Sequence, residues 1–198
     1  AISGMIYDKN ILKDAVKEHY ENLARENVSV NGEAAKITTS IGYAAEALAG
    51  IPKEADLGLG CGNPQEAAKP RLNETVLDLG CGRGLDCFIA SKAVGKNGKV
   101  LGLDGSETMI SRATAIAIKN GFTNCEFILG EIEDIPLPDN SLDLIMSNCV
   151  INLSTDKYRV YSEIYRCLRN GGRTAISDIT LQKTLPKEWV SDPNMVKT

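Results

Sequence analysis

The sequence contains a single histidine, no surplus of positive charge and no long apolar run. Its 22 Lys and Arg residues stand against 26 Asp and Glu, which gives a formal net charge of −4, and the basic residues are scattered. This charge argues against binding to nucleic acid or to a membrane through a polybasic surface. No apolar run has the length of a membrane span and no export signal begins the chain, so the sequence predicts a soluble, cytoplasmic protein.

The six cysteines occur in a chain without an export signal. Because cytosolic thiols are kept reduced, the sequence predicts free thiols and no disulfide framework. Their spacing matches no zinc finger or zinc ribbon. The chain of 198 residues is long enough to bury a hydrophobic core without disulfides or a structural metal. We expect a monomer whose partners are small molecules.

Residues 76–84 read VLDLGCGRG and place three glycines, Gly80, Gly82 and Gly84, at alternate positions after a short apolar run. The next segment, residues 85–94, repeats apolar residues at helical spacing, so the expected order is strand, loop and helix. A loop without side chains lets a ligand lie against the backbone, and the helix N-terminus behind it offers free N–H groups. The pattern therefore indicates a site for a polar or anionic ligand.

Two classes of ligand use a glycine loop of this kind. A dinucleotide fingerprint reads G-x-G-x-x-G, whereas this loop reads G-x-G-x-G with Asp78 two residues before it. A carboxylate there would repel a pyrophosphate, but it can face the amino group of S-adenosylmethionine. Asp104 ends the next apolar run, VLGLD, where ribose hydroxyls are usually held. The pattern favours S-adenosylmethionine.

Strands and helices are expected to alternate through the rest of the chain. Apolar runs predict strands, and helical spacing with a Ser106 N-cap and a Gly121 stop predicts helices between them. The expected strands are 99–104, 125–129, 142–147 and 173–179, and the expected helices are 107–119 and 158–168, the last one stopped by residues 170–172. This order predicts a parallel sheet with helices on both faces. Right-handed crossovers would place Asp78, Gly80, Asp104, Asn148 and Cys149 on one rim.

The first 60 residues are expected to form an N-terminal helical extension. Residues 1–9 look like a mobile start, and residues 10–26 carry their apolar positions on one helical stripe. That helix either packs on the main body or covers the cofactor as a lid, and His19 beside the stripe is interpreted as a surface group. Residues 27–42 are weakly structured by pattern and lead into a short helix at 44–48.

Residues 57–64 read LGLGCGNP and resemble the later glycine loop. No sustained apolar strand precedes them, so we interpret them as a turn and not as a second nucleotide site. Asn63 and Pro64 are a good N-cap and first residue for the helix that follows. Cys61 lies just ahead of that helix, where the dipole would favour a thiolate, although a small residue in a tight turn explains it equally well.

These features resemble the class I S-adenosylmethionine-dependent methyltransferases, and more narrowly the arsenite methyltransferase family. The resemblance spans residues 41–185 and rests on ADLGLGCGNP at 55–64, VLDLGCGRGLDCF at 76–88 and SNCVINL at 147–153. It implies a Rossmann-like class I fold, S-adenosylmethionine as cofactor and S-adenosylhomocysteine as product. It also implies that Cys61 and Cys149 hold trivalent arsenic, and that a thioredoxin- or glutathione-type reductant recycles them.

Cofactor contacts are expected from the glycine loop and from the segments after the second, third and fourth strands. Ile132 with either Glu131 or Glu133 would contact the adenine, and the sequence does not choose between the two acids. The expected cofactor residues are Asp78, Gly80, Cys81, Gly82, Gly84, Asp104, Gly105, Met109, Glu131, Ile132, Glu133 and Asn148.

The chain departs from the family pattern in two ways. Residues 1–60 contain no cysteine where family members commonly have one, so a third arsenic ligand would come from a small thiol, from Cys87 or from missing residues. Cys81 lies inside the cofactor loop. Cys125 and Cys167 are expected in core-facing elements, where a cysteine acts as a small hydrophobic residue. Family members also have two strands after the fifth, so we expect a cofactor-binding domain at 61–198 that is truncated at its C-terminus.

Two alternatives to arsenite methylation stay open. The chain either methylates another small organic molecule, such as a quinone precursor, or binds S-adenosylmethionine without catalysis.

Overall fold

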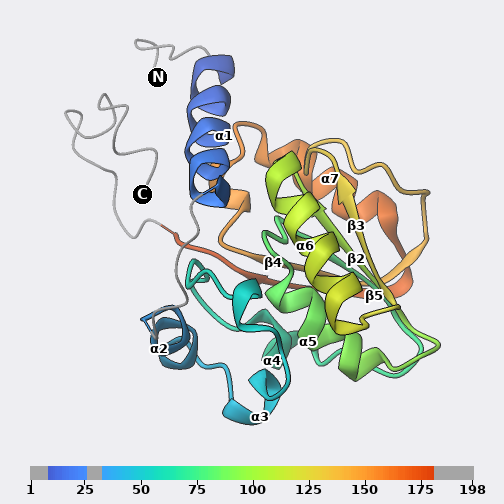
Figure 1. Ribbon diagram of the computed structural model, residues 1–198. Coiled ribbons are helices and arrows are strands. Elements are labelled where there is room, and N and C mark those ends of the chain that lie inside the picture. Colours follow the sequence, from blue (N-terminus) through green and yellow to red (C-terminus); the bar gives the residue numbers. More distant parts are fainter. Residues whose placement is uncertain (1–8, 26–32, 181–198) are drawn as a thin grey trace.

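A five-stranded parallel sheet organises the computed structural model, which describes residues 9–25 and 33–180 (Figure 1). The strands are β1 (Thr75–Leu79), β2 (Lys99–Asp104), β3 (Cys125–Leu129), β4 (Leu142–Asn148) and β5 (Leu168–Ser177). Their order is β3-β2-β1-β4-β5, which confirms the predicted Rossmann-like α/β class. The strand order reverses between β1 and β4, and a ligand crevice is expected at that point.

Helices cover both faces of the sheet, so its central strands are apolar on both sides. On one face, Leu77 and Leu79 of β1 pack with Val160 and Ile164 of α7 (Lys157–Cys167). On the other face, alternate residues of β1, β2 and β4 pack against α4 (Pro64–Ala68) and α5 (Leu85–Val94). Burial on both faces explains why β1 reads as a continuous apolar run.

The helix termini follow the capping signals in the sequence. The Ser106 side chain accepts a hydrogen bond from the Met109 N–H at the start of α6 (Glu107–Asn120), and Gly121 ends that helix in a left-handed conformation. The Asn63 side chain accepts from the backbone of Gln65 and Glu66 at the start of α4. Side-chain acceptors thus satisfy N–H groups that the helices leave free.

The N-terminal segment contains one more helix than the sequence pattern predicts. α1 (Lys9–Arg25) confirms the amphipathic helix, and α3 (Ala45–Leu48) confirms the short one. α2 (Glu33–Ser40) lies where a weakly structured stretch was expected. Its Thr38 is 1% exposed and donates a 2.7 Å hydrogen bond to Asp56, so a tertiary contact stabilises a helix that lacks an apolar stripe. The short 3-10 helices are η1 (Lys53–Ala55) and η2 (Ile151–Leu153).

The fifth strand begins earlier than predicted. Residues 170–172 were expected to form a turn after a helix ending at residue 168, but α7 ends at Cys167 and Leu168 already pairs with Leu142. The register shifts before Arg173 pairs with Leu144, and Gly171 adopts a φ of +81° within the shifted stretch. The glycines therefore form an irregularity inside the strand. β5 ends at Ser177, two residues before the predicted end.

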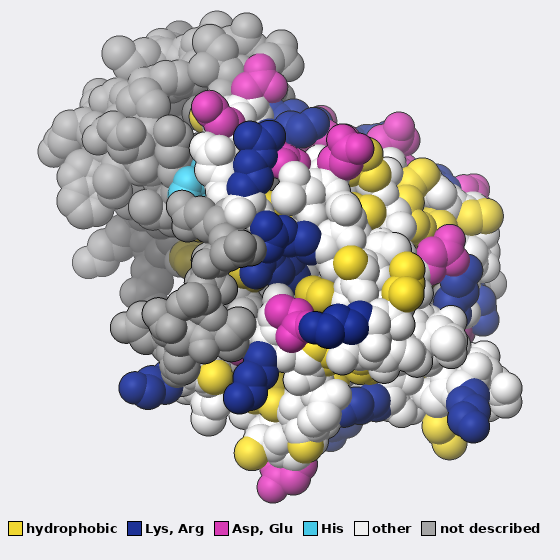
Figure 2. Space-filling model, viewed as in Figure 1, with side chains coloured by type: hydrophobic (Ala, Val, Ile, Leu, Met, Phe, Trp, Pro, Cys, Tyr) yellow, Lys and Arg dark blue, Asp and Glu magenta, His cyan; other side chains and the backbone are white. Residues whose placement is uncertain are grey.

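The expected mobile start and the polar end at residues 181–198 fall outside the described residues, apart from residue 9. Across 9–25 and 33–180, none of the helices combines the length and the apolar character needed to cross a bilayer. On the face shown in Figure 2, basic and acidic side chains are interspersed.

Candidate cofactor and thiol site

A cavity of about 230 Å³ opens at the carboxyl edge of the sheet, where the strand order reverses. The glycine loop after β1, the segments after β2 and β3, and the loop after β4 form its walls. α1 contributes Lys13, Val16, Lys17 and Tyr20 to the lining, and residues 55–60 contribute another part. α1 also packs on α6, so it lies against the body of the domain, and its role as a lid over the cofactor stays a prediction.

The predicted cofactor residues line this cavity with the exception of Gly84. Gly84 is the N-cap of α5, with a φ of +90°. A Cβ atom at this position would lie 2.9 Å from Cζ of Phe127, closer than carbon atoms pack. Gly84 therefore allows the close packing of α5 against β3, and its contact with a cofactor stays a prediction.

The glycine loop approaches the cavity with bare backbone. Gly80 and Gly82 have φ values of +68° and +52°, which favour glycine. A Cβ at Gly80 would lie 2.5 Å from Val150, so no residue larger than glycine fits at this position of the loop. The N–H groups of Gly80 and Cys81 both donate to the Leu103 carbonyl, at 2.8 and 3.0 Å, which fixes the loop against β2. This cradle fits a ligand that lies flat on the backbone.

Asp104 is held rigidly at the end of β2. One carboxylate oxygen accepts from the Gly82 N–H and the other from the Ser106 N–H, each at 2.9 Å. Burial raises the pKa of this carboxyl, and the two backbone hydrogen bonds oppose the rise. The side chain therefore has a defined orientation toward the cavity and can accept from ribose hydroxyls.

Asp78 is 2% exposed on β1 and lies on the α5 face of the sheet. Its carboxylate accepts a hydrogen bond from the Cys87 thiol at 3.5 Å. Burial, and next the nearby charge of Asp86, raise the pKa of Asp78 well above its usual value. A cationic ligand group beside this carboxylate would stabilise its charged form, so the donor set fits the methionine end of S-adenosylmethionine.

The two candidate adenine acids have different partners. The Glu133 carboxylate accepts from the Ser154 hydroxyl, and its carbonyl accepts from Arg159 at 3.0 Å. Glu131 forms a 3.1 Å ion pair with Lys13 of α1, and both side chains are more than 40% exposed. The hydrogen bond that holds Glu133 is partly buried, whereas the ion pair of Glu131 is exposed to solvent. Glu131 can therefore exchange its protein contact for a ligand more easily than Glu133 can.

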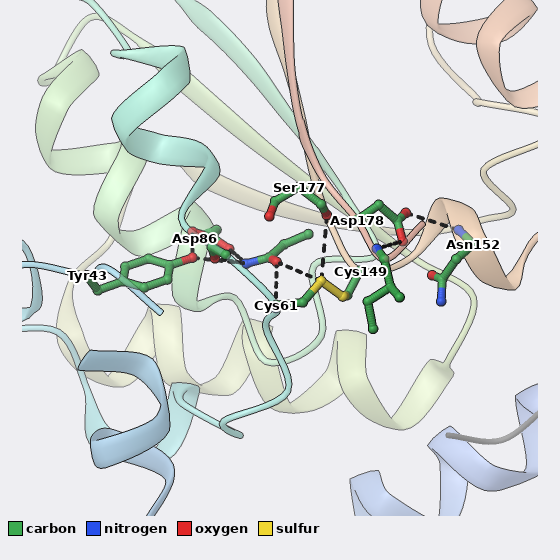
Figure 3. Close-up of a disulfide and its surroundings, with 10 residues drawn as sticks. Tyr43, Cys61, Asp86, Cys149, Asn152, Ser177 and Asp178 are labelled. Carbon is green, nitrogen blue, oxygen red and sulfur yellow. Dashed lines mark hydrogen bonds between the residues drawn. A yellow bond between two sulfur atoms is a disulfide. The ribbon is translucent and has the colours of Figure 1, made fainter. Parts of the chain in front are cut away.

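Cys61 and Cys149 meet at the cavity although 88 residues separate them in sequence (Figure 3). Their Cα atoms lie 5.9 Å apart and their sulfurs form a disulfide. The prediction that all six cysteines are free thiols is therefore wrong for this pair, because the fold brings the two backbones within the usual disulfide range. Cys149 lines the cavity itself, whereas Cys61 lies against it through the bonded sulfur.

The other four cysteines are not paired in disulfides. Cys87 is fully buried among core residues, and burial raises the pKa of its thiol well above the ordinary value. It does not line the cavity, and its role as a third arsenic ligand stays a prediction. Cys81 lines the cavity from the glycine loop, and burial raises the pKa of its thiol to about 11. Cys125 and Cys167 pack in core clusters, as expected.

Sequence reasoning missed a buried polar group beside the disulfide. Tyr43 and Asp86 line the cavity next to Asn148, and the Tyr43 hydroxyl donates to the Asp86 carboxylate at 2.7 Å (Figure 3). An acid in the first turn of a helix is ordinary, because it complements the helix dipole, so the sequence held no signal for this role of Asp86. Asn148 was predicted to bind the cofactor; it lines the cavity, and its side chain is hydrogen-bonded to this group and to the Cys61 loop.

Comparisons with known proteins agree with this geometry. Residues 71–198 match the protein family described as Methyltransferase domain. An arsenite methyltransferase of Halobacterium salinarum is 47% identical over 154 residues, which are 78% of this chain and 39% of that protein. The human arsenite methyltransferase is 34% identical over 194 residues, which are 91% of this chain and 51% of that protein.

Among solved structures, an arsenic(III) S-adenosylmethionine methyltransferase from Chlamydomonas reinhardtii gives a TM-score of 0.63 at 36% identity, covering 80% of this chain and 54% of that one. The chain thus spans about half or less of the length of these relatives. The family match includes the glycine loop, Asp104 and Asn148, which together form the walls of the cavity. The chain therefore belongs to the class I S-adenosylmethionine-dependent methyltransferase domains, with arsenite methyltransferases among its relatives.

Proposed function

We propose that this chain methylates trivalent arsenic that is held by Cys61 and Cys149, and that it serves arsenic detoxification. One observation carries the proposal. Two cysteines from loops far apart in sequence meet at a Cα separation of 5.9 Å, and one of them, Cys149, lines the cavity that the cofactor residues line. The similarity to arsenite methyltransferases over 78% of the chain supports the same substrate.

The chemistry of arsenic suits a pair of thiols. Trivalent arsenic is a soft centre that prefers thiolate sulfur to oxygen or nitrogen ligands. When bound, S-adenosylmethionine supplies an electrophilic methyl group on a sulfonium sulfur. The arsenic lone pair can accept that methyl group without loss of a proton, so the reaction needs no general base. This agrees with the place of His19, which lies on α1 and does not line the cavity.

The residues of the chain bind and orient the two reactants. Asp78 would face the cofactor's amino group, Asp104 would hold the ribose hydroxyls, and Glu131 with Ile132 would contact the adenine edge. The two cysteines would fix the arsenic at the same edge of the sheet. Such positioning contributes about 7 to 11 kcal/mol to catalysis in favourable cases. A small thiol, or a residue outside the described part of the chain, would complete the arsenic ligands.

The disulfide must be reduced before arsenic can bind. Two molecules of a monothiol such as glutathione, or one molecule of a dithiol of the thioredoxin type, convert it to two protein thiols and release the oxidised reductant as its own disulfide. Arsenous acid then exchanges two of its hydroxyl groups for the two sulfurs and releases two water molecules. A reductant is therefore a co-substrate of the proposed reaction.

Methyl transfer from labelled S-adenosylmethionine to arsenite, in the presence of glutathione, tests the proposal. Cys61→Ser and Cys149→Ser should each abolish methylarsenical formation while leaving the cofactor dissociation constant within about threefold, a difference of under 1 kcal/mol. Cys125→Ser is the matched control, because this half-buried thiol does not line the cavity. Unchanged turnover in both cysteine variants would contradict the proposal.

Two further outcomes separate the alternatives. If arsenite does not raise the melting temperature of the reduced protein but an organic acceptor is methylated, the chain acts on another small molecule. If S-adenosylmethionine and arsenite both bind in calorimetry and no methyl group is transferred in a single turnover, the chain binds without catalysis.

A further inference from the structure

One side chain connects the two cysteine loops. Asn148 directly precedes Cys149, and its amide oxygen accepts from the Cys61 N–H at 3.1 Å. Its amide nitrogen donates to the Gly62 carbonyl at 2.9 Å. These two contacts hold the backbone on both sides of the Cys61–Gly62 peptide bond. The position of the Cys61 loop relative to Cys149 is therefore set through this amide.

The two cysteines are anchored in different ways. The Cys149 N–H donates to the Ser177 carbonyl at 2.8 Å, so this residue is fixed by the backbone at the end of β5. The Cys61 sulfur lies 3.9 Å from the same carbonyl, a weak contact. Backbone hydrogen bonding thus holds one sulfur, whereas the other depends on the orientation of a carboxamide.

A buried pair of residues determines that orientation (Figure 3). The Asn148 nitrogen lies 3.1 Å from the Tyr43 hydroxyl oxygen and 3.3 Å from an Asp86 carboxylate oxygen. The Tyr43 hydroxyl donates to the other Asp86 oxygen at 2.7 Å, and Gln65 donates to it at 3.1 Å. Tyr43 is 2% exposed and Asp86 is 7% exposed.

Burial raises the pKa of the Asp86 carboxyl, and when this carboxyl is ionised the donors and acceptors of the group allow one arrangement. An ionised carboxylate only accepts, so the Tyr43 proton points to Asp86 and the Tyr43 oxygen is left to accept from Asn148. The Asn148 nitrogen must then face Tyr43, and its oxygen must face the Cys61 N–H. A flipped amide would place its nitrogen against that N–H and leave buried donors unpaired.

We propose that Tyr43 and Asp86 are positioning residues for the thiol pair, because they fix the Asn148 amide and through it hold Cys61 within bonding reach of Cys149. The consequence for arsenic methylation rests on the proposed function. The geometry of the thiol pair, however, can be measured without arsenic or cofactor.

The test is the equilibrium between the reduced protein and oxidised glutathione, which yields the Cys61–Cys149 disulfide and two molecules of reduced glutathione. Alkylation of the remaining thiols and mass spectrometry of the peptides give the constant. Tyr43→Phe removes the hydroxyl and keeps the ring, and should lower the constant about tenfold, as expected when a buried amide loses one partner. Tyr158→Phe is the matched control, since Tyr158 is 85% exposed, and should leave it unchanged.

A second variant displaces the same amide from another side. A Cβ at Gly60 would lie 2.9 Å from the Asn148 nitrogen, and Gly60 does not have a left-handed backbone. Gly60→Ala should therefore lower the disulfide constant to a similar degree without backbone strain. If Tyr43→Phe loses its cooperative thermal transition, the disulfide constant of Gly60→Ala decides the test. A wild-type constant in a folded Tyr43→Phe protein, or in Gly60→Ala, would overturn the proposal.

Two more readouts separate positioning from cofactor contact and from the proposed function. Titration calorimetry should give Tyr43→Phe the wild-type affinity for S-adenosylmethionine within about twofold, whereas a tenfold loss would assign Tyr43 to the cofactor and overturn the positioning role. The arsenite dissociation constant of the reduced variant should rise about tenfold. If the wild-type protein does not bind arsenite, the proposed function fails while the glutathione equilibrium still decides the positioning role.

Discussion

Replacing Asp78 with asparagine should strengthen the fold and weaken cofactor binding. The carboxyl is 2% exposed, and its pKa is raised first by burial and then by the charge of Asp86. A raised pKa means that the native state favours the protonated form, so the stability contributed by this group is complete at low pH and is lost as pH rises through the raised pKa. Asparagine removes that loss and keeps the shape of the side chain.

The size of the effect follows from the same linkage. A tenfold change in proton affinity corresponds to about 1.4 kcal/mol, so we expect Asp78→Asn to gain on the order of 1 kcal/mol near pH 8. For a chain of this length that is about 2 to 4 °C in melting temperature. The gain should shrink as pH falls through about 4 and vanish below it, where the carboxyl is protonated in both states. Hydrogen bonds to charged groups contribute about 1.5 to 3 kcal/mol, so affinity for S-adenosylmethionine should fall at least tenfold.

Thermal melts at pH 4 to 8 and titration calorimetry at pH 8 measure both quantities on the same preparation. Asp14→Asn is a useful control, because Asp14 is exposed on α1 and does not line the cavity. An Asp78→Asn protein that is less stable than wild type at pH 8, or that binds S-adenosylmethionine with wild-type affinity, would refute the reasoning.

Two other substitutions test the fold around the site. Gly84→Ala should destabilise the domain by about 2 to 4 kcal/mol in denaturant melts, because it combines left-handed strain with overlap against Phe127; a loss under 1 kcal/mol would contradict the packing role. Arg173 lowers the pKa of Glu74 through a 2.6 Å ion pair, so this acid contributes stability above its ordinary pKa that is lost as pH falls. Glu74→Gln should therefore cost about 1 to 2 kcal/mol at pH 7 and little below about pH 4, and a pH-independent difference would speak against the pair.

The elements with strong local signals could be predicted from the sequence. β1 and β2 are buried on both faces, so they read as apolar runs, and the glycines after β1 mark the loop that follows the strand. α6 begins and ends at its capping residues, Ser106 and Gly121. The alternation of such elements was sufficient to predict a parallel sheet with helices on both faces and to gather the cofactor residues on one rim.

The elements that depend on distant contacts could not be predicted. α2 is held by the Thr38–Asp56 hydrogen bond and carries no apolar stripe. The start of β5 depends on pairing between Leu168 and Leu142, which overrides the turn signal of the glycines that follow. The Tyr43–Asp86–Asn148 group joins segments up to 105 residues apart, and none of its members has a periodic or spacing signal of its own.

The central claim is that Cys61 and Cys149 together bind arsenic, and protection from alkylation tests it most directly. The reduced protein is treated with arsenite, alkylated with iodoacetamide and digested, and the labelling of each cysteine is read by mass spectrometry. We predict that one equivalent of arsenite protects Cys61 and Cys149 together, and that Cys61→Ser removes the protection of Cys149. Equal labelling of both cysteines with and without arsenite would contradict the account.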